Sequence, residues 1–319
     1  MPDFRFAIMG AGHIARKFVR AAALLPDCTV CAIASRSLAR ARAFAQEMSL
    51  PAAYGSYEEM LLAERPDCVY IAASTDLHAE LSLLCLHHGV PVLCEKAMCR
   101  STAEAQAVFS LAREKAVFAM EALWSCFLPP VTKARQWIAE GRIGEVAMAE
   151  MSLGFLAEDD PENRYFSPAK GGGAGYDLSV YGYHLITSIL GRRAERMQAQ
   201  VVPRHGVDAS EMILLGLEGG IPAVVKSSFL APVKEELLIQ GSRGRILIPH
   251  AHYASEAVLL DASGAQIERF TDAQTLNGFT YEAQEVMRCI REGKIESETV
   301  PHHATLQCAE MFDLIGELI

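Results

Sequence analysis

The chain has 319 residues, of which 51% are hydrophobic and 21% are charged, so it can bury the cores of two ordinary domains and is not expected to be disordered. Its formal net charge is −10, and its Lys and Arg residues are scattered and form no long run, which argues against a nucleic-acid partner. No apolar stretch approaches the length that spans a bilayer, and the N-terminal segment lacks a cleavage signal, so no membrane partner is expected.

Nine cysteines are dispersed among apolar residues, which predicts buried thiols in a reducing cytoplasm and not a disulfide framework. Cys28 and Cys31 form a C-x-x-C pair, but they lie inside the apolar run CTVCAIAS, and on a strand residues three apart point to opposite faces. A zinc site would also need a second pair of ligands. The sequence therefore predicts no metal site.

Short apolar strands alternate with helical segments over the first 125 residues. The predicted strands are 4–10, 29–36, 52–55, 68–74, 90–96 and 117–124, and the predicted helices are 13–25, 37–48, 56–64, 76–89 and 102–115. The strands are almost continuously apolar, which is typical of a parallel sheet that is covered on both faces. Residues 1–125 are therefore predicted to form a doubly wound α/β domain.

Residues 126–319 follow a different pattern, in which strands succeed one another without intervening helices. Strands are predicted at 145–155, 195–203, 211–218, 222–230, 234–240, 244–248 and 256–260, and helices at 130–140, 174–190, 280–292 and 302–318. Turn signals such as LEGG and GSRG favour a large, mostly antiparallel sheet. The prediction is an α+β domain, whose C-terminal helix is a candidate to pack back on the first domain.

A glycine-rich turn follows the first predicted strand. Gly10 and Gly12 with Ala15 give G-x-G-x-x-A, and His13 and Ile14 open the next helix. In this pattern the first glycine permits a tight turn, the second lets backbone amides approach a pyrophosphate, and the small third residue allows close helix–strand packing. A purely structural turn is the alternative. The surrounding strand–helix rhythm favours a dinucleotide site on a Rossmann sheet.

The end of the second strand bears on which nicotinamide cofactor is bound. A site that prefers NAD usually places Asp or Glu there, against the ribose 2′-hydroxyl. This chain has Ser35, Arg36 and Arg40 instead, with no acidic residue within five positions of Arg36. A guanidinium suits a 2′-phosphate by charge and by bidentate geometry, so NADP is predicted in preference to NAD. The alternative is that Arg36 is a solvated turn residue.

Two further segments carry candidate catalytic side chains. Glu95 and Lys96 end the fifth strand, at the sheet edge where doubly wound domains bind their ligands. Asp177, Tyr181 and His184 follow a triple glycine at positions i, i+4 and i+7 of a predicted helix. This spacing places an acid, a phenol and an imidazole on one helix face.

The motifs together resemble the Gfo/Idh/MocA oxidoreductases, named for glucose–fructose oxidoreductase and inositol dehydrogenase. The resemblance covers essentially the whole chain and rests on G-x-G-x-x-A, the EK strand end, GRIGEV and GGGxxxD. Ala97 and Tyr181 stand where the sugar dehydrogenases of the family usually have Pro and His. DLSVY at 177–181 and MEALWSCFLP at 120–129 resemble the branch of dimeric dihydrodiol dehydrogenases and NADP-dependent D-xylose dehydrogenases, in which Arg is common at the position of Cys126.

The resemblance implies hydride transfer between a nicotinamide and a sugar, polyol or cyclic trans-diol. Tyr181 is then the acid/base, and Lys96 lowers the pKa of the phenol from about 10 and contacts the nicotinamide ribose. Asp177 would orient Lys96 or the substrate hydroxyls. The resemblance also implies a homodimer that forms through the sheet of the second domain, which would bind the substrate.

Further candidates border the cofactor or the substrate. STDLH, with Ser74, Thr75 and His78, matches the Ser/Thr-x-x-x-His of the family beside the cofactor. Trp124, Phe127 and Phe155 are candidates for aromatic walls of the substrate pocket, with interdomain packing as the alternative for the first two. His184 is either a substrate contact or a core histidine.

Two other functions remain open on the sequence. One is an NAD-linked sugar or inositol dehydrogenase of the wider family. The other is a non-catalytic nucleotide-sensing regulator on the same fold, which would have no need for Lys96 and Tyr181.

Overall fold

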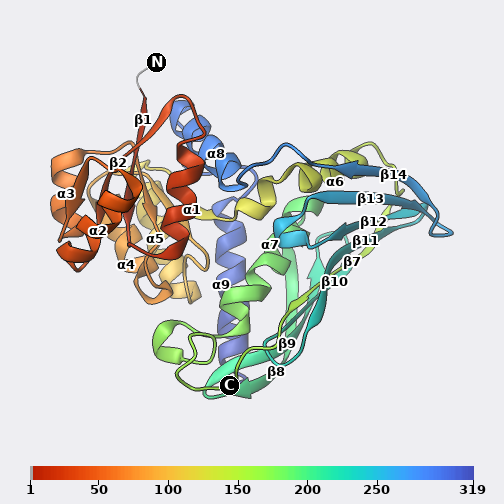
Figure 1. The fold of residues 1–319 in the computed structure, drawn as a ribbon. Helices are drawn as coiled ribbons and strands as arrows, with labels where there is room; N and C mark the ends of the chain where they lie inside the picture. Colours follow the sequence, from red (N-terminus) through yellow and green to blue (C-terminus); the bar gives the residue numbers. More distant parts are fainter. Residues whose placement is uncertain (1–2) are drawn as a thin grey trace. The chain divides into compact units, whose positions relative to one another are not determined.

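Six parallel strands form the first sheet of the computed structural model, which describes residues 3–319. Their order, β3-β2-β1-β4-β5-β6, is that of a doubly wound dinucleotide-binding sheet and confirms the predicted fold (Figure 1). The strands are β1 (Phe4–Met9), β2 (Cys28–Ala34), β3 (Ala52–Tyr54), β4 (Cys68–Ile71), β5 (Val92–Glu95) and β6 (Ala119–Ala122). Phe6 and Ile8 of β1 are completely buried, as expected for a strand covered on both faces.

The helices between these strands are α1 (His13–Ala22), α2 (Leu38–Met48), α3 (Tyr57–Glu64), α4 (His78–His87) and α5 (Thr102–Lys115). Ser37, Ser56 and Ser101 cap α2, α3 and α5, because each hydroxyl accepts a hydrogen bond from the backbone N–H three residues later, at 3.3–3.4 Å. These caps explain why three helices begin within two residues of their predicted starts. A short 3₁₀ turn, η1 (Thr75–Leu77), precedes α4.

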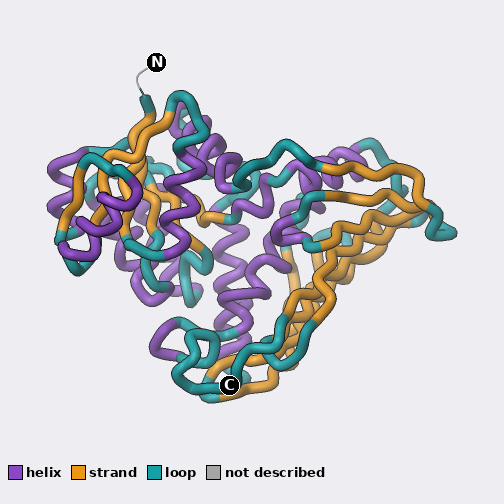
Figure 2. Tube along the Cα trace, viewed as in Figure 1, coloured by secondary structure: helices purple, strands orange, loops and turns teal. Residues whose placement is uncertain are grey.

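The second sheet has eight strands in the order β14-β13-β12-β11-β7-β10-β9-β8. Figure 2 shows strands of this sheet running side by side in orange. They are β7 (Val146–Gly154), β8 (Ala194–Arg204), β9 (Val207–Leu217), β10 (Ile221–Ser228), β11 (Val233–Gly241), β12 (Gly244–Pro249), β13 (Glu256–Asp261) and β14 (Gln266–Thr271). All neighbouring strands are antiparallel except β7 and β10. The predicted mostly antiparallel sheet is therefore confirmed.

Helices α6 (Pro129–Ala139) and α7 (Val180–Leu190) pack against this second sheet, α6 on β12–β14 and α7 on β7 and β10. Short turns also shape this part of the chain: η2 (Trp124–Phe127), η3 (Pro168–Lys170), the π-helical η4 (Gly175–Ser179) and η5 (Ala251–Tyr253). The last two helices of the chain are α8 (Phe279–Arg291) and α9 (His302–Gly316).

The chain divides into two compact units, and the division is discontinuous. The first unit runs to Ala122 and adds Asn277–Thr305; the second comprises Leu123–Leu276 and Leu306–Ile319. Helix α8 belongs to the first unit because it packs against α1. The predicted span 126–319 is thus interrupted by a segment that folds with the nucleotide-binding sheet.

One predicted strand was too long, and one strand of the second sheet was missed. The strand expected at 117–124 ends at Ala122, and Trp124–Phe127 form the 3₁₀ turn η2 instead. Strand β14 was not predicted, because Gln266–Thr271 is largely exposed at the sheet edge and its sequence has no apolar run. Among the described residues, no helix is long and apolar enough to cross a membrane, and no group of three or more His, Cys, Asp or Glu side chains could hold a metal ion.

Candidate functional site

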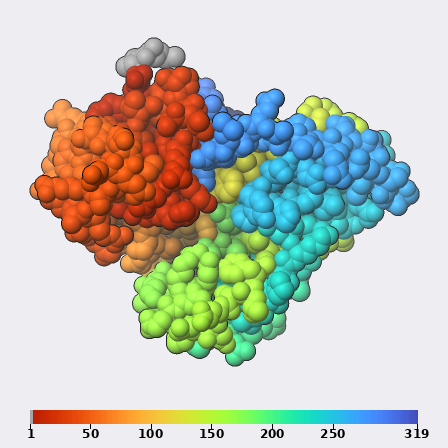
Figure 3. All heavy atoms as spheres, in the orientation of Figure 1, coloured from red at the N-terminus to blue at the C-terminus, as the bar shows by residue number. Residues whose placement is uncertain are grey.

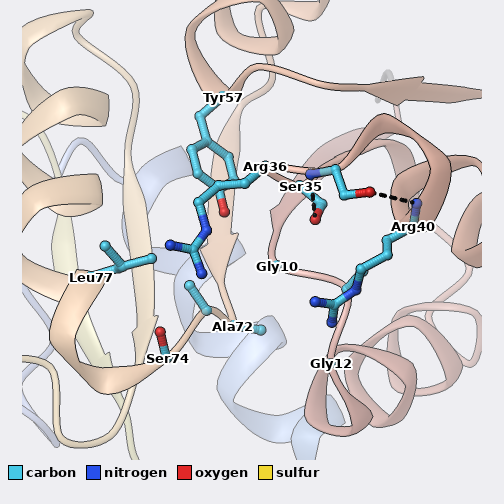
Figure 4. Close-up of a pocket in the computed structure, with 12 residues that line it drawn as sticks. Gly10, Gly12, Ser35, Arg36, Arg40, Tyr57, Ala72, Ser74 and Leu77 are labelled. Atoms are coloured by element: carbon cyan, nitrogen blue, oxygen red, sulfur yellow. Dashed lines mark hydrogen bonds between the residues drawn. The ribbon is translucent and has the colours of Figure 1, made fainter. Parts of the chain in front are cut away.

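A cavity of about 360 Å³ opens at the carboxyl edge of the first sheet, beside the neighbouring strands β1 and β4 at which the strand order reverses. Figure 4 shows the residues that line it. This is the position at which doubly wound sheets bind their ligands. The predicted cofactor residues Gly10, Gly12, Ser35, Arg36, Arg40 and Ser74 all line it, together with Ala11, Ser37, Tyr57, Ala72, Ala73 and Leu77.

Gly10 is required by the geometry of this turn. Its φ is +107°, and a Cβ at this position would lie 2.4 Å from the carbonyl oxygen of Ala72. Only glycine tolerates both conditions. At Gly12 a Cβ would be 3.6 Å from the same oxygen, so this position is not crowded by the protein and leaves the start of α1 open to a ligand.

The positive charge of the cavity comes from the segment that links β2 to α2. Arg36 and Arg40 are exposed, and the backbone N–H of Arg40 donates to the Ser37 hydroxyl at 3.4 Å. Ser35 accepts from the N–H of Ser37 at the same distance. Among the described residues that line the cavity, none is acidic. The cavity therefore offers hydrogen-bond donors of three kinds, namely a helix N-terminus, hydroxyl groups and two guanidinium groups. This set of donors fits a nucleotide that carries phosphate groups.

Tyr57, the first residue of α3, also lines the cavity beside these arginines. Burial raises the pKa of its phenol, while the nearby charges of Arg36 and Arg40 oppose that shift. The phenol therefore stays protonated at neutral pH, so that it adds a hydroxyl and no negative charge to the cavity.

The remaining predicted cofactor residues lie around the cavity without lining it. His13 and Ile14 form the first turn of α1, and Thr75 begins η1. His78 is buried, with Nδ1 2.8 Å from the carbonyl oxygen of Ala97 and Nε2 3.2 Å from that of Ala73. Burial lowers the pKa of His78, and its contacts with the two carbonyl oxygens oppose that shift.

Glu95 and Lys96 stand at the end of β5, as predicted. Glu95 is buried and accepts hydrogen bonds from the Tyr70 hydroxyl and from the N–H of Lys96. Burial raises the pKa of Glu95 to about 7, against the lowering effect of the Tyr70 hydrogen bond and the Lys96 charge. Lys96 is half-buried, and the peptide bond that joins it to Ala97 is cis.

Tyr181 and Asp177 lie in the second unit, at the beginning of the helix that follows the triple glycine. Tyr181 is half-buried in the first turn of α7, whereas the rest of that turn is buried. Asp177 lies in η4, and Arg164 Nη2 is 3.4 Å from its Oδ2. His184 is 1% exposed. The structure thus sets His184 in the interior of the unit and leaves Tyr181 accessible.

A pair of buried carboxyl groups anchors this helix start to the second sheet. Asp208 accepts from the N–H of Gly175 at 2.5 Å, and Glu211 accepts from the Ser179 hydroxyl. Asp208 also occupies the space that a Cβ on Gly173, at φ +128°, would need. Burial raises the pKa of Glu211 well above its ordinary value, and the adjacent Asp208 adds to the shift. Two hydrogen-bonded carboxyl groups in such a place retain a proton between them.

The candidate aromatic walls lie on turns. Trp124 and Phe127 are half-buried in η2, which packs against α7 and η5. Cys126, at the position where the branch often has Arg, is fully buried, and its carbonyl oxygen accepts from Arg135 Nη2 at 2.7 Å. Arg135 also donates to the Ser188 hydroxyl at 2.6 Å, which ties η2 to α7.

Phe155, the candidate for the opposite wall, belongs to an aromatic cluster after β7. Its ring lies 5.0 Å from that of Tyr165 and 5.3 Å from that of Phe229. The Arg164 guanidinium lies over Tyr165 at 4.0 Å. The loop that carries Arg164 and Tyr165 is at the surface, among the yellow-green atoms of Figure 3. No motif marks these two residues, so the sequence did not predict the contact of Arg164 with Asp177 or the packing of Tyr165 on Phe155.

Known proteins match this chain over almost its whole length. A model of the oxidoreductase family with an NAD-binding Rossmann fold matches residues 4–123, and a model of the GFO/IDH/MocA C-terminal domain matches residues 131–247. The trans-1,2-dihydrobenzene-1,2-diol dehydrogenase of Xenopus tropicalis is 32% identical over 302 residues, which cover 92% of this chain and 91% of that protein. The Danio rerio enzyme of the same name is 33% identical over 320 residues, with 97% and 95% covered.

Proteins of known structure share this fold. The aldose-aldose oxidoreductase of Caulobacter crescentus, complexed with glycerol, superposes with a TM-score of 0.88 at 20% identity, over 99% of this chain and 97% of that chain. The two family models, the identity to the dehydrogenases and the strand order agree. The chain therefore belongs to the Gfo/Idh/MocA family of oxidoreductases, as its motifs predicted.

Proposed function

We propose that this protein is an NADP-dependent dehydrogenase or reductase that acts on a sugar, a polyol or a cyclic trans-diol. The observation that carries the cofactor preference is the cavity at the end of β2, which presents Arg36 and Arg40. Its described lining residues include no acid that could pair with a ribose 2′-hydroxyl. The diol dehydrogenases that share about a third of the sequence support the substrate class.

Tyr181 is the acid/base of the proposed reaction. When bound, the nicotinamide supplies or accepts the hydride. In the oxidising direction the phenolate of Tyr181 takes the proton of the substrate hydroxyl, and in the reducing direction the phenol gives a proton to the carbonyl oxygen. An ordinary tyrosine has a pKa of about 10, so a nearby cation must favour the phenolate. We assign that role, and a contact with the nicotinamide ribose, to Lys96 on the family likeness.

Asp177 is proposed to orient the substrate hydroxyls or Lys96. Its contact with Arg164 offsets its charge and limits its rotation. Trp124 and Phe127 are proposed as a wall for a ring-shaped substrate, because η2 packs beside the helix that carries Tyr181. Nine free, buried thiols are consistent with a reducing cytoplasm.

The test is a spectrophotometric screen of NADP and NAD with aldoses, polyols and cyclic trans-diols. We expect NADP-linked oxidation of at least one member, with a preference over NAD of about tenfold or more. A preference of that size for NAD would favour the NAD-linked sugar or inositol dehydrogenase. Cofactor binding without turnover of any alcohol or carbonyl compound would favour a nucleotide-sensing regulator.

A homodimer is proposed through the face of the second sheet that lies opposite α6 and α7. Met148, Val202, Met212 and Leu214 are large apolar side chains that are exposed on its strands. Patches of this kind mark interaction surfaces. We expect sedimentation velocity to show a dimer, and Leu214→Glu to shift it toward monomer. The proposal fails if the wild-type protein is monomeric at micromolar concentration.

A further inference from the structure

The one-turn helix η5, between β12 and β13, brings an imidazole to the candidate acid/base. The ring centroids of His252 and Tyr181 are 5.2 Å apart, with an angle of 42° between the planes. Tyr253 packs edge-on against the other side of His252, at 4.4 Å. The side chain of His252 is 27% exposed, so it remains accessible to a small molecule.

Glu235 of β11 fixes the orientation of this imidazole. Its Oε1 lies 2.6 Å from His252 Nδ1 and accepts from the backbone N–H of His252 at 3.0 Å. The Glu235 side chain is 9% exposed, so its carboxylate depends on these donors. A carboxylate bonded to Nδ1 favours a proton on that nitrogen, which leaves Nε2 as the ring nitrogen that a ligand can bond. Among the described residues, none is hydrogen-bonded to Nε2.

A β-bulge places Glu235 at this position. Val233 pairs with Gly154 and Glu236 pairs with Ser152, so Lys234 and Glu235 together oppose the single residue between those partners. Lys234 is 81% exposed and forms an ion pair with Glu236, whereas Glu235 turns toward η5. Bulges commonly redirect a side chain beside a functional site.

We propose that His252 binds a second hydroxyl of the substrate, next to the hydroxyl that reacts at Tyr181. The inference rests on the proposed function and adds to it the residue that recognises the hydroxyl next to the reacting one. A phenol and an oriented imidazole whose rings are in contact can each bond one of two adjacent hydroxyls of the same molecule. The second hydroxyl donates to Nε2, and a mono-alcohol leaves that nitrogen without its partner. A site built in this way discriminates strongly against an analogue that lacks the group.

The decisive experiment compares matched substrates in the wild type and in His252→Phe, which keeps an aromatic ring beside Tyr181. The substrates are trans-1,2-cyclohexanediol and cyclohexanol, or any vicinal diol found in the screen and its deoxy analogue. We expect kcat/KM for the diol to fall about 10- to 100-fold in the variant, with the value for the mono-alcohol almost unchanged. Equal losses for both substrates would overturn the inference, because they would indicate a packing role only.

His250→Phe is the matched control. His250 Nδ1 is 3.7 Å from the same Glu235 carboxylate, but its side chain is 61% exposed and it bonds the Tyr253 hydroxyl at 2.9 Å. We expect the preference for the diol to survive this change. Glu235→Gln, which keeps the shape but lowers the basicity of the partner, should reduce the preference by a smaller factor than His252→Phe.

A binding measurement separates this inference from the proposed function, because it needs no turnover. In protein labelled at histidine, the His252 ring signal can be assigned by comparison with His252→Phe. We expect the diol to shift that signal at concentrations at which the mono-alcohol does not. A shift without turnover would contradict the proposed function and support the diol site. Turnover without a shift, or an equal shift with both compounds, would contradict the diol site alone.

Discussion

Tyr181→Phe is expected to lower kcat by about 10²–10⁴-fold, which is the usual contribution of a positioned acid/base. The substitution removes one oxygen atom and keeps the ring that packs against His252. Binding of NADPH should not change, because the described residues that line the cofactor cavity all belong to the first unit. The measurement is steady-state turnover with a working substrate, together with NADPH affinity from fluorescence.

Tyr183→Phe provides the matched control on the same helix. Tyr183 is fully buried, and its hydroxyl donates to Gln307 Oε1 at 3.2 Å. Removal of that hydroxyl should cost about 1 kcal/mol of stability, the usual value of one hydrogen bond, and should leave kcat within a few-fold of the wild type. If Tyr181→Phe and Tyr183→Phe behave alike, Tyr181 is not the acid/base.

The double variant Arg36→Ala/Arg40→Ala is expected to weaken NADPH binding about a hundredfold and to leave NADH binding almost unchanged. In the proposed complex each exposed guanidinium would contribute a charge-assisted bond to the 2′-phosphate, and solvent screening would limit the gain from each. NADH lacks that phosphate and loses nothing when the arginines are removed. The dissociation constants of both cofactors, measured at two salt concentrations, test this expectation.

Arg42→Ala is the control for net charge, because Arg42 is exposed on the same helix and is not among the residues that line the cavity. It should leave the ratio of NADPH to NADH affinity unchanged. A loss of NADH affinity as large as that of NADPH in the double variant would show that the arginines support the fold of the cavity and do not select the cofactor.

Most elements of the first sheet could be predicted because the residues that determine them lie close together in the sequence. Gly10 must be glycine because of its backbone angle and the nearby Ala72 carbonyl, and that requirement leaves a motif in the sequence. Serine caps mark three helix starts in the same way. The end of β6 could not be predicted in this way. The strand was expected to run to residue 124, but an apolar run alone cannot distinguish a strand from a buried 3₁₀ turn such as η2.

The residues around Tyr181 could be predicted only in part. His252 and Glu235 lie far from Tyr181 along the chain, and a bulge and a single helical turn bring them together. Neither the bulge nor the single helical turn has a recognisable pattern in the sequence. Asp208 and Glu211 were missed for a related reason, since an acid on a strand ordinarily indicates an exposed face and theirs is buried under η4.

The residues proposed to select the cofactor occupy one short piece of chain, from the end of β2 to the first turn of α2. None of them belongs to the unit that carries Tyr181 and His252. If the proposed assignment holds, mutations in that piece would exchange one coenzyme for another during evolution without disturbing the choice of substrate, and mutations around Tyr181 would change the substrate without disturbing the choice of coenzyme. The same separation would allow the coenzyme used by this protein to be changed by engineering, through substitutions in that one segment.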